Sequence, residues 1–188
     1  GSLLTGGSLK CWGWNSEYQL GTNDQVNRNV PASVVALSGA VSQISTGWQH
    51  TCALLPGGGV KCWGLGSSGQ LGNTSNATRP YAVEVVNLGD TMVGLTSNGS
   101  HNCALGSGGG LRCWGLNNDG QLGNGSTLNR NLPVTPAGLT SGVTAFAAGE
   151  QHTCAVQFGV MQCWGSNASG QVGDGSTASS RTLPVEVP

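Results

Sequence analysis

The sequence has few charged and few aromatic residues. Asp, Glu, Lys and Arg together make up 8% of its 188 residues, and Phe, Trp and Tyr make up 5%, whereas about a quarter of an ordinary globular chain is charged. No segment carries charges at the i, i+4 spacing of an exposed helix. The formal net charge of −1 gives no electrostatic attraction to nucleic acid or to an anionic membrane, so we expect neither as a partner.

Long apolar runs and enzyme signatures are also absent. No stretch of about 18 apolar residues could cross a membrane, and no leader peptide opens the sequence, so we expect no membrane insertion. The sequence contains no G-x-S-x-G, no Gly-Lys phosphate loop and no H-E-x-x-H. Its eight Asp and Glu residues form no repeated pair. We therefore expect no enzymatic activity and no cofactor.

Glycine, in contrast, occupies 33 positions, and most of the sequence is repeated. The segment HTCALLPGGGVKCWGLGSSGQLG from His50 recurs from His101 and from His152, and residues 9–21 carry its second half. The cysteines of the four CWG motifs are 51, 51 and 50 residues apart, and a period of this size predicts a propeller or a solenoid. We divide the chain, as one domain, into units 1–51, 52–102, 103–153 and 154–188, the last of them incomplete.

Each period is expected to contain four short strands: an apolar strand through the first cysteine, the CWG strand, a GQLG strand and a proline-bearing outer strand. Gly47, Asn98 and Gly149 stand where the apolar strand turns before the histidine, and these residue types favour the left-handed region. Four antiparallel strands in about 50 residues make a propeller blade. We predict an all-β fold of about 3.7 β-propeller blades, arranged as an open arc or half of a ring.

Six of the seven cysteines are predicted to form hairpin disulfides. A three-residue loop in the second and third units places the two cysteines opposite each other, and in the fourth unit a two-residue turn at Phe158-Gly159 restores this register. Disulfides persist in oxidising compartments, so we place the protein at the cell surface or outside the cell. The predicted pairs are Cys52–Cys62, Cys103–Cys113 and Cys154–Cys163, and Cys11 is left unpaired.

A metal site formed by His50, Cys52 and Cys62 is the alternative to these disulfides. Zinc sites usually hold two cysteines on a C-x2–4-C turn, and this spacing does not occur here, so we predict no metal. The repeated histidines are interpreted as structural hydrogen-bonding residues, and the repeated tryptophans as core between the blades. These residues are His50, His101 and His152, and Trp12, Trp63, Trp114 and Trp164.

Four arginines recur at intervals of 51 residues: Arg28, Arg79, Arg130 and Arg181. The first interpretation is structural, with each arginine bonding the loop that precedes it. The alternative is a circle of arginines that binds an anionic partner.

The motifs G-x-x-H-x-C-A-L, G-x-V-x-C-W-G-x-N and G-Q-L-G together resemble the regulator-of-chromosome-condensation repeat family, and the blade cysteines resemble its bacterial or secreted members. The resemblance implies a seven-bladed propeller, of which this chain would form about half. One branch of the family acts on a small GTPase and on chromatin, but the basic tail and inserted loop for that role are missing here. In secreted inhibitors of the family, the partner sits on one face of the propeller.

Binding residues are sought where the repeats differ. Two such positions precede each repeated histidine, and another follows each CWG motif; the resemblance places them among partner-facing loops. We predict an extracellular protein-interaction module with these binding residues: Trp48, Gln49, Gly99, Ser100, Glu150, Gln151 and Trp14. The competing interpretation is that Trp14 and Trp48 only pack on neighbouring loops.

Two other functions stay open. The chain could be a structural unit that self-associates with another copy through its incomplete first and last units. Less favoured is a carbohydrate-binding or enzymatic propeller, which requires an aromatic-lined pocket with converging carboxylates.

Overall fold

The computed structural model describes the backbone of residues 2–3 and 8–188 and the side chains from residue 8 onward, and it is all-β. The described strands form four antiparallel sheets, which we call blades 1 to 4 in chain order. In the described residues, no helix is long and apolar enough to cross a membrane. Blade 1 contains β1 (Ser2–Leu3), β2 (Leu9–Gly13) and β3 (Arg28–Ser33). Blade 2 contains β4 (Gln43–Thr46), β5 (His50–Leu54), β6 (Val60–Gly64) and β7 (Arg79–Glu84); blade 3 contains β8 (Met92–Asn98), β9 (His101–Gly106), β10 (Leu111–Gly115) and β11 (Arg130–Val134); blade 4 contains β12 (Val143–Ala148), β13 (His152–Gln157), β14 (Val160–Ser166) and β15 (Ser180–Glu186).

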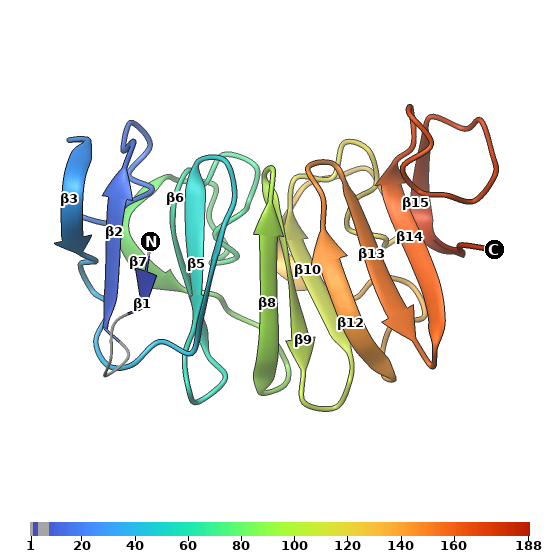
Figure 1. Ribbon diagram of the computed structural model, residues 1–188, viewed down its shortest axis with the longest axis horizontal. Helices are drawn as coiled ribbons and strands as arrows, with labels where there is room; N and C mark the ends of the chain where they lie inside the picture. The colour runs from blue at the N-terminus through green and yellow to red at the C-terminus, as the bar shows by residue number, and fades with distance from the viewer. Residues whose placement is uncertain (1, 4–7) are drawn as a thin grey trace.

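The four blades stand side by side in an open arc, with blades 1 and 4 at opposite ends (Figure 1). Within blades 2 to 4 the strands are paired in chain order, and the first strands β4, β8 and β12 pack against one another from blade to blade. This arrangement confirms the predicted partial propeller. The predicted unit boundaries fall inside β5, β9 and β13, because sequence repetition determines the period but not the point at which a blade begins.

The cysteine register is as predicted. Cys52 pairs with Cys62, Cys103 with Cys113 and Cys154 with Cys163, both as strand partners and as disulfides. The β13–β14 hairpin of blade 4 is one residue shorter than the other two, and it turns at Phe158 and Gly159. Their φ angles of 51° and 85° are those of a two-residue type I′ turn. Cys11 is buried and has no disulfide partner, and burial raises the pKa of its thiol.

The predicted GQLG strand is wrong. This segment is a turn in every blade. In blade 2, for example, the Gly69 N–H donates to the Gly66 carbonyl and the Gly72 N–H donates to the Gly69 carbonyl. Gly69 and Gly72 have φ angles of 82° and 63°, which an extended strand cannot contain. In blades 2 to 4 the fourth strand arises instead because the apolar segment and the His-x-Cys segment are two separate strands, such as β4 and β5.

The expected left-handed conformation at Gly47, Asn98 and Gly149 is also wrong, because none of the three has a positive φ. Glycine is needed at two of these positions for space. A Cβ atom on Gly47 would lie 2.2 Å from the His50 ring, and one on Gly149 would lie 2.2 Å from the His152 ring. The histidine side chain therefore folds back over its own turn.

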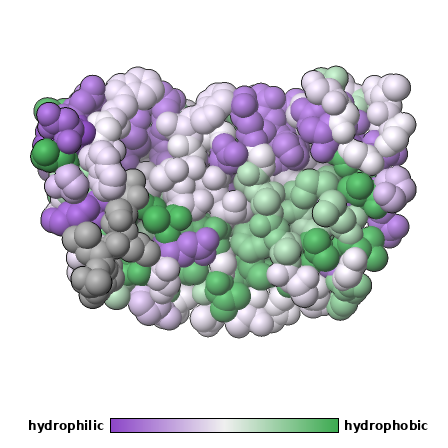
Figure 2. Space-filling model, in the orientation of Figure 1, coloured by the Kyte–Doolittle hydropathy of each residue, from purple (hydrophilic) through white to green (hydrophobic). Residues whose placement is uncertain are grey.

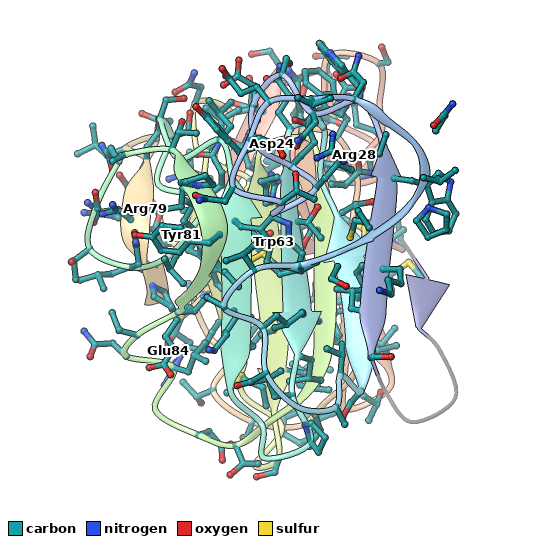
Figure 3. All side chains as sticks on the ribbon, turned by 90° about the vertical axis from the view of Figure 1, so that its left-hand side faces the viewer. Asp24, Arg28, Trp63, Arg79, Tyr81 and Glu84 are labelled. Carbon is teal, nitrogen blue, oxygen red and sulfur yellow. A yellow bond between two sulfur atoms is a disulfide. The ribbon has the colours of Figure 1, made fainter. Side chains whose placement is uncertain are left out.

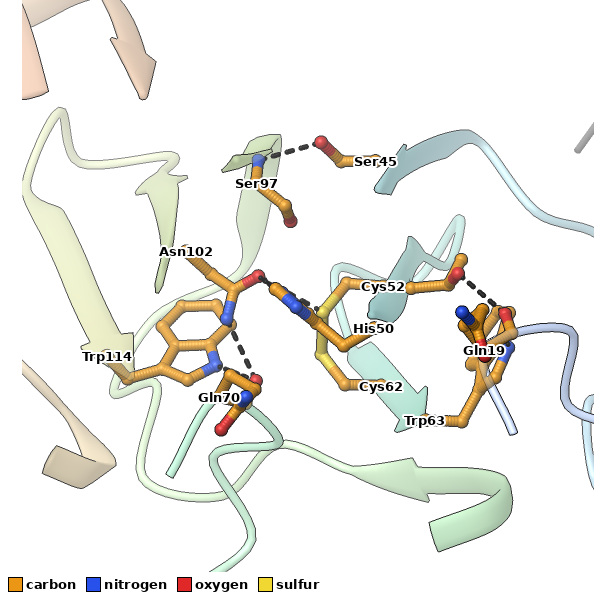
Figure 4. The surroundings of a disulfide bond; sticks show 11 residues. Gln19, Ser45, His50, Cys52, Cys62, Trp63, Gln70, Ser97, Asn102 and Trp114 are labelled. Atoms are coloured by element: carbon orange, nitrogen blue, oxygen red, sulfur yellow. Dashed lines mark hydrogen bonds between the residues drawn. A yellow bond between two sulfur atoms is a disulfide. The ribbon is translucent and has the colours of Figure 1, made fainter. Parts of the chain in front are cut away.

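A hydrogen-bond network joins each blade to the next (Figure 4). The Gln70 carbonyl of blade 2 accepts the Trp114 indole N–H at 3.1 Å and the Asn102 amide N–H at 2.8 Å, both from blade 3. Because the Asn102 amide nitrogen is used there, its Oδ1 must accept from His50 Nε2, 2.7 Å away. At the other interfaces Thr51 and Trp63 donate to the Gln19 carbonyl, and Thr153 and Trp164 to the Gln121 carbonyl.

His50 and His101 are thus neutral structural donors between blades, whereas the structural role predicted for His152 stays a prediction. His101 Nε2 repeats the contact of His50 by lying 2.9 Å from Thr153 Oγ1. Burial lowers the pKa of His50 to about 4, and burial together with the neighbouring histidines lowers that of His101 to about 3. The alternative metal site lacks its thiolates, since Cys52 and Cys62 are bonded to each other.

The four CWG tryptophans are not equivalent, contrary to the sequence expectation. Trp63, Trp114 and Trp164 are completely buried between blades, but Trp12 is 42% exposed. Each buried indole lies against a glycine of the preceding blade, for instance Trp114 against Gly72. Among the described residues no glycine lies against Trp12 in this way.

Candidate functional site

The residue pairs that differ between the repeats are the tips of three tight hairpin turns. Trp48-Gln49 joins β4 to β5, with the Gly47 N–H donating to the His50 carbonyl at 3.0 Å. Gly99-Ser100 joins β8 to β9, and Glu150-Gln151 joins β12 to β13. We call the surface formed by these three turns and by the residues that follow the CWG motifs the rim.

Backbone contacts lock the three turns together. The Trp48 N–H donates to the Gly99 carbonyl at 2.9 Å, and a Cβ atom on Gly99 would lie 2.1 Å from the Glu150 carbonyl oxygen. Gly99 has a φ of 49°, and its own N–H is held by the Asn98 side chain at 2.8 Å. Gly99 is buried by these contacts, so it positions the neighbouring turns and does not itself offer a binding side chain.

The residue after each CWG motif lies beside the turn of its own blade. Leu65 N–H donates to the Gln49 carbonyl, Leu116 N–H to the Ser100 carbonyl and Ser166 N–H to the Gln151 carbonyl, at 2.8–2.9 Å. The sequence positions selected as partner-facing in blades 2 to 4 are therefore brought together. Trp14 occupies the corresponding position of blade 1.

Two tryptophans dominate the exposed surface of the rim. Trp48 is 59% exposed and Trp14 is 58% exposed. Both line a hollow of about 170 Å³, together with Trp12 and the polar residues Gln19 and Thr46. Glu150 and Gln151 are exposed on blade 4, and Gln49 and Ser100 are half-buried. None of the described residues that line the hollow is a carboxylate.

Trp12 is the member of this hollow that the sequence analysis missed. Because Trp12 has the same place in the repeat as the three buried tryptophans, the sequence analysis assigned it to the core. Its exposure, however, depends on whether another blade packs beside it. The missing His-x-Cys motif ahead of the first CWG is the signal that could have distinguished Trp12 from the other three tryptophans.

The chain matches a family model described as the regulator of chromosome condensation (RCC1) repeat over residues 7–54 and 109–156, and a second model of that description over residues 41–70. The chain belongs to the RCC1 repeat family. It is 36% identical to the ultraviolet-B receptor UVR8 of Arabidopsis thaliana over 70% of this chain and 30% of that protein. It is 37% identical to the probable E3 ubiquitin-protein ligase HERC4 of Homo sapiens over 72% of this chain and 13% of that one.

Solved structures show the same RCC1-type fold. Human WBSCR16 superposes with a TM-score of 0.85 at 23% identity, covering 99% of this chain and 48% of that one. Yeast RCC1 (Prp20), solved bound to Kap60, gives a TM-score of 0.83 at 20% identity, covering 97% of this chain and 45% of that one. The chain thus spans about half of these solved chains and less than a third of the two curated relatives.

Proposed function

We propose that this chain is a protein-binding module whose partner contacts the rim, with Trp14, Trp48, Glu150 and Gln151 supplying the exposed side chains. The main observation behind this proposal is the backbone contact between the three turns. The Trp48–Gly99 hydrogen bond and the Gly99–Glu150 approach use only backbone atoms, so the side chains of Trp48 and Glu150 are available to a partner. Exposed tryptophans on a rigid backbone are typical anchors of protein interfaces. Repeats of this family commonly mediate protein–protein interaction, which supports the assignment.

The partner is proposed to be extracellular. Three disulfides in 188 residues favour an oxidising compartment. Among the relatives, one from Arabidopsis thaliana is named a mitochondrial RCC1 domain-containing protein, at 39% identity over 65% of this chain, so family membership alone does not determine the compartment. The absence of enzymatic activity stays a prediction.

Trp48→Ala is expected to weaken partner binding about tenfold or more, with little change in melting temperature, because the Trp48 side chain is 59% exposed. The immobilised chain would be incubated with an extracellular extract, and captured proteins quantified by mass spectrometry. The dissociation constant of the purified captured protein would then be measured by calorimetry.

Leu128→Ala serves as the matched control, since Leu128 is 65% exposed but lies on a loop outside the rim. This variant should bind as the unmodified chain does. His101→Asn should instead lower the melting temperature, because His101 is buried between blades. Equal binding by the Trp48→Ala and Leu128→Ala variants would refute the rim as the binding surface.

Self-association with a second copy is the second candidate function, and an exposed apolar face favours it. Apolar side chains gather over β12 and β13 (Figure 2), where Phe146, Val156 and Met161 line a hollow of about 190 Å³. The corresponding residues of blade 2, Leu54 and Val60, are buried against blade 3. Light scattering is expected to give a solution mass of two chains, and the Met161→Glu variant is expected to give the mass of one chain. A monomer at all concentrations would contradict self-association.

A further inference from the structure

The four repeated arginines fall into two classes that the sequence does not distinguish. Arg28 Nη2 lies 2.7 Å from Asp24 Oδ2, and Arg181 Nε lies 2.5 Å from Asp174 Oδ2. These are the ion pairs found among the described residues. Arg79 and Arg130, in blades 2 and 3, have a buried Nε that bonds to no described residue. Figure 3 shows Arg28 beside Asp24, and Arg79 on the outer strand of the next blade.

The backbone places all four arginines alike. Arg28, Arg79, Arg130 and Arg181 are the strand partners of Gly13, Gly64, Gly115 and Gly165, the glycines of the CWG motifs. The difference between the two classes therefore comes from the loop in front of each arginine.

In blade 1 that loop is closed by a carboxylate with two functions. Asp24 Oδ1 accepts the Val26 N–H at 2.9 Å and so caps the turn, while Asp24 Oδ2 binds Arg28. Asp174 also has two functions in blade 4, but from another position of the loop, seven residues before its arginine and not four. Its Oδ1 accepts the Ser176 N–H at 3.0 Å and its Oδ2 binds Arg181. The Ser176 hydroxyl and N–H and Arg181 lower the pKa of Asp174 to about 2.

In blades 2 and 3 neither position holds a carboxylate. Asn73 and Asn124 stand at the position of Asp174, and their Oδ1 atoms accept the Ser75 and Ser126 N–H groups at 3.3 and 3.2 Å. At the position of Asp24 stands a serine. Ser75, four residues before Arg79, accepts the Ala77 N–H on its hydroxyl at 3.1 Å, and Ser126, four residues before Arg130, accepts the Leu128 N–H at 3.0 Å. The hydroxyl reproduces the capping oxygen of Asp24 but supplies no second oxygen and no negative charge. Arg79 and Arg130 keep the same strand position as Arg28 and Arg181, but no carboxylate of the preceding loop accepts a hydrogen bond from their guanidinium groups.

We propose that Arg79 and Arg130 are oxyanion-binding sites, each taking a carboxylate, sulfate or phosphate group in the role that Asp24 and Asp174 have in blades 1 and 4. A guanidinium edge binds two oxygens of such a group in parallel, and Arg28 and Arg181, at the same strand position, each bind a carboxylate oxygen. A buried polar atom without a partner calls for an ion or a water, and the positive charge favours the ion. These sites lie on the outer strands β7 and β11, apart from the turns of the rim.

The test follows the Nε–Hε signals of the four arginines by NMR while sodium sulfate replaces sodium chloride at constant ionic strength. The Arg79 and Arg130 signals are expected to shift and saturate. The Arg28 and Arg181 signals should stay nearly unchanged, because their carboxylates already occupy the position. Unchanged Arg79 and Arg130 signals, or equal and non-saturating shifts of all four, would overturn the proposal.

Two double variants separate oxyanion binding from a general salt effect. Ser75→Asp with Ser126→Asp supplies the second oxygen within the chain, so the sulfate response of Arg79 and Arg130 should disappear and the melting temperature should rise. Ser75→Asn with Ser126→Asn caps the turn without a charge and should keep the response. If the Asp variant responds to sulfate as fully as the Asn variant does, sulfate does not bind at the guanidinium groups of Arg79 and Arg130, and the proposal is wrong.

Discussion

Trp114→Ala is expected to lower the free energy of unfolding by about 3–5 kcal/mol, the usual cost of removing a large buried aromatic side chain. Trp114 is completely buried between blades 2 and 3, and its indole N–H donates to the Gln70 carbonyl. Trp12→Ala removes the same residue from the same repeat position but should cost less than about 1 kcal/mol, because Trp12 is 42% exposed. Urea unfolding with the disulfides intact, followed by circular dichroism, measures both values.

A third variant separates packing from hydrogen bonding. Trp114→Phe retains most of the buried area but leaves the Gln70 carbonyl with Asn102 as its donor, so the expected loss is about 1–3 kcal/mol. The slope of the unfolding free energy against urea concentration should be the same for all variants. A changed slope would indicate that blades unfold separately, and the free energies of the variants could then not be compared. Equal losses for Trp12→Ala and Trp114→Ala would show that burial between blades does not determine the contribution of this motif.

Two kinds of feature were predicted correctly from the sequence: those that depend on neighbours within one hairpin, and those that the repetition of the motifs shows. Cys154 and Cys163 are separated by one residue fewer than the other pairs, and the two-residue turn at Phe158-Gly159 compensates for this, so the disulfide register follows from local geometry alone. The period, the all-β class and the open arc likewise follow from motifs repeated three or four times.

The features that sequence reasoning missed depend on contacts between repeats. Trp12 and Trp114 occupy the same place in the CWG motif, but one is exposed and the other is buried against the neighbouring blade. Gly99 was selected as a binding position because it differs from Trp48 and Glu150, and the approach of the Glu150 carbonyl, which requires a glycine there, is not visible in the sequence. Equally, the unpaired state of Arg79 becomes visible only when Asp24 is seen to use its two oxygens for two different bonds.

The histidine network predicts a pronounced loss of stability in mild acid. In the folded chain His50 already donates its Nε2 proton to Asn102, so a second proton would have to bind at Nδ1. The Nδ1 atoms of His50 and His101 are buried and have no hydrogen-bond partner among the described residues. A charged imidazolium is therefore disfavoured in the fold, and the pKa is lowered to about 4 for His50 and about 3 for His101.

In the unfolded chain both histidines take up a proton near the ordinary pKa of about 6.5. Their contribution to stability is thus complete above pH 6.5 and is lost as the pH falls from there towards the folded pKa values. Between pH 7.5 and pH 4.5 each histidine is expected to reduce the free energy of unfolding by about 2–3 kcal/mol. Asp24, Asp90 and Asp174, whose pKa values are lowered from 3.8, lose their stabilising contribution only at more acid pH and do not enter this window.

Urea unfolding at half-unit steps of pH measures this loss, and His101→Asn tests its origin. The variant should be less stable than the unmodified chain at pH 7.5, because it removes the bond to Thr153. The difference should shrink by about 2–3 kcal/mol at pH 4.5, since asparagine takes up no proton in the unfolded state. A constant difference between the two proteins across this range would mean that His101 is protonated in the folded chain as readily as in the unfolded one, and that the network tolerates an imidazolium.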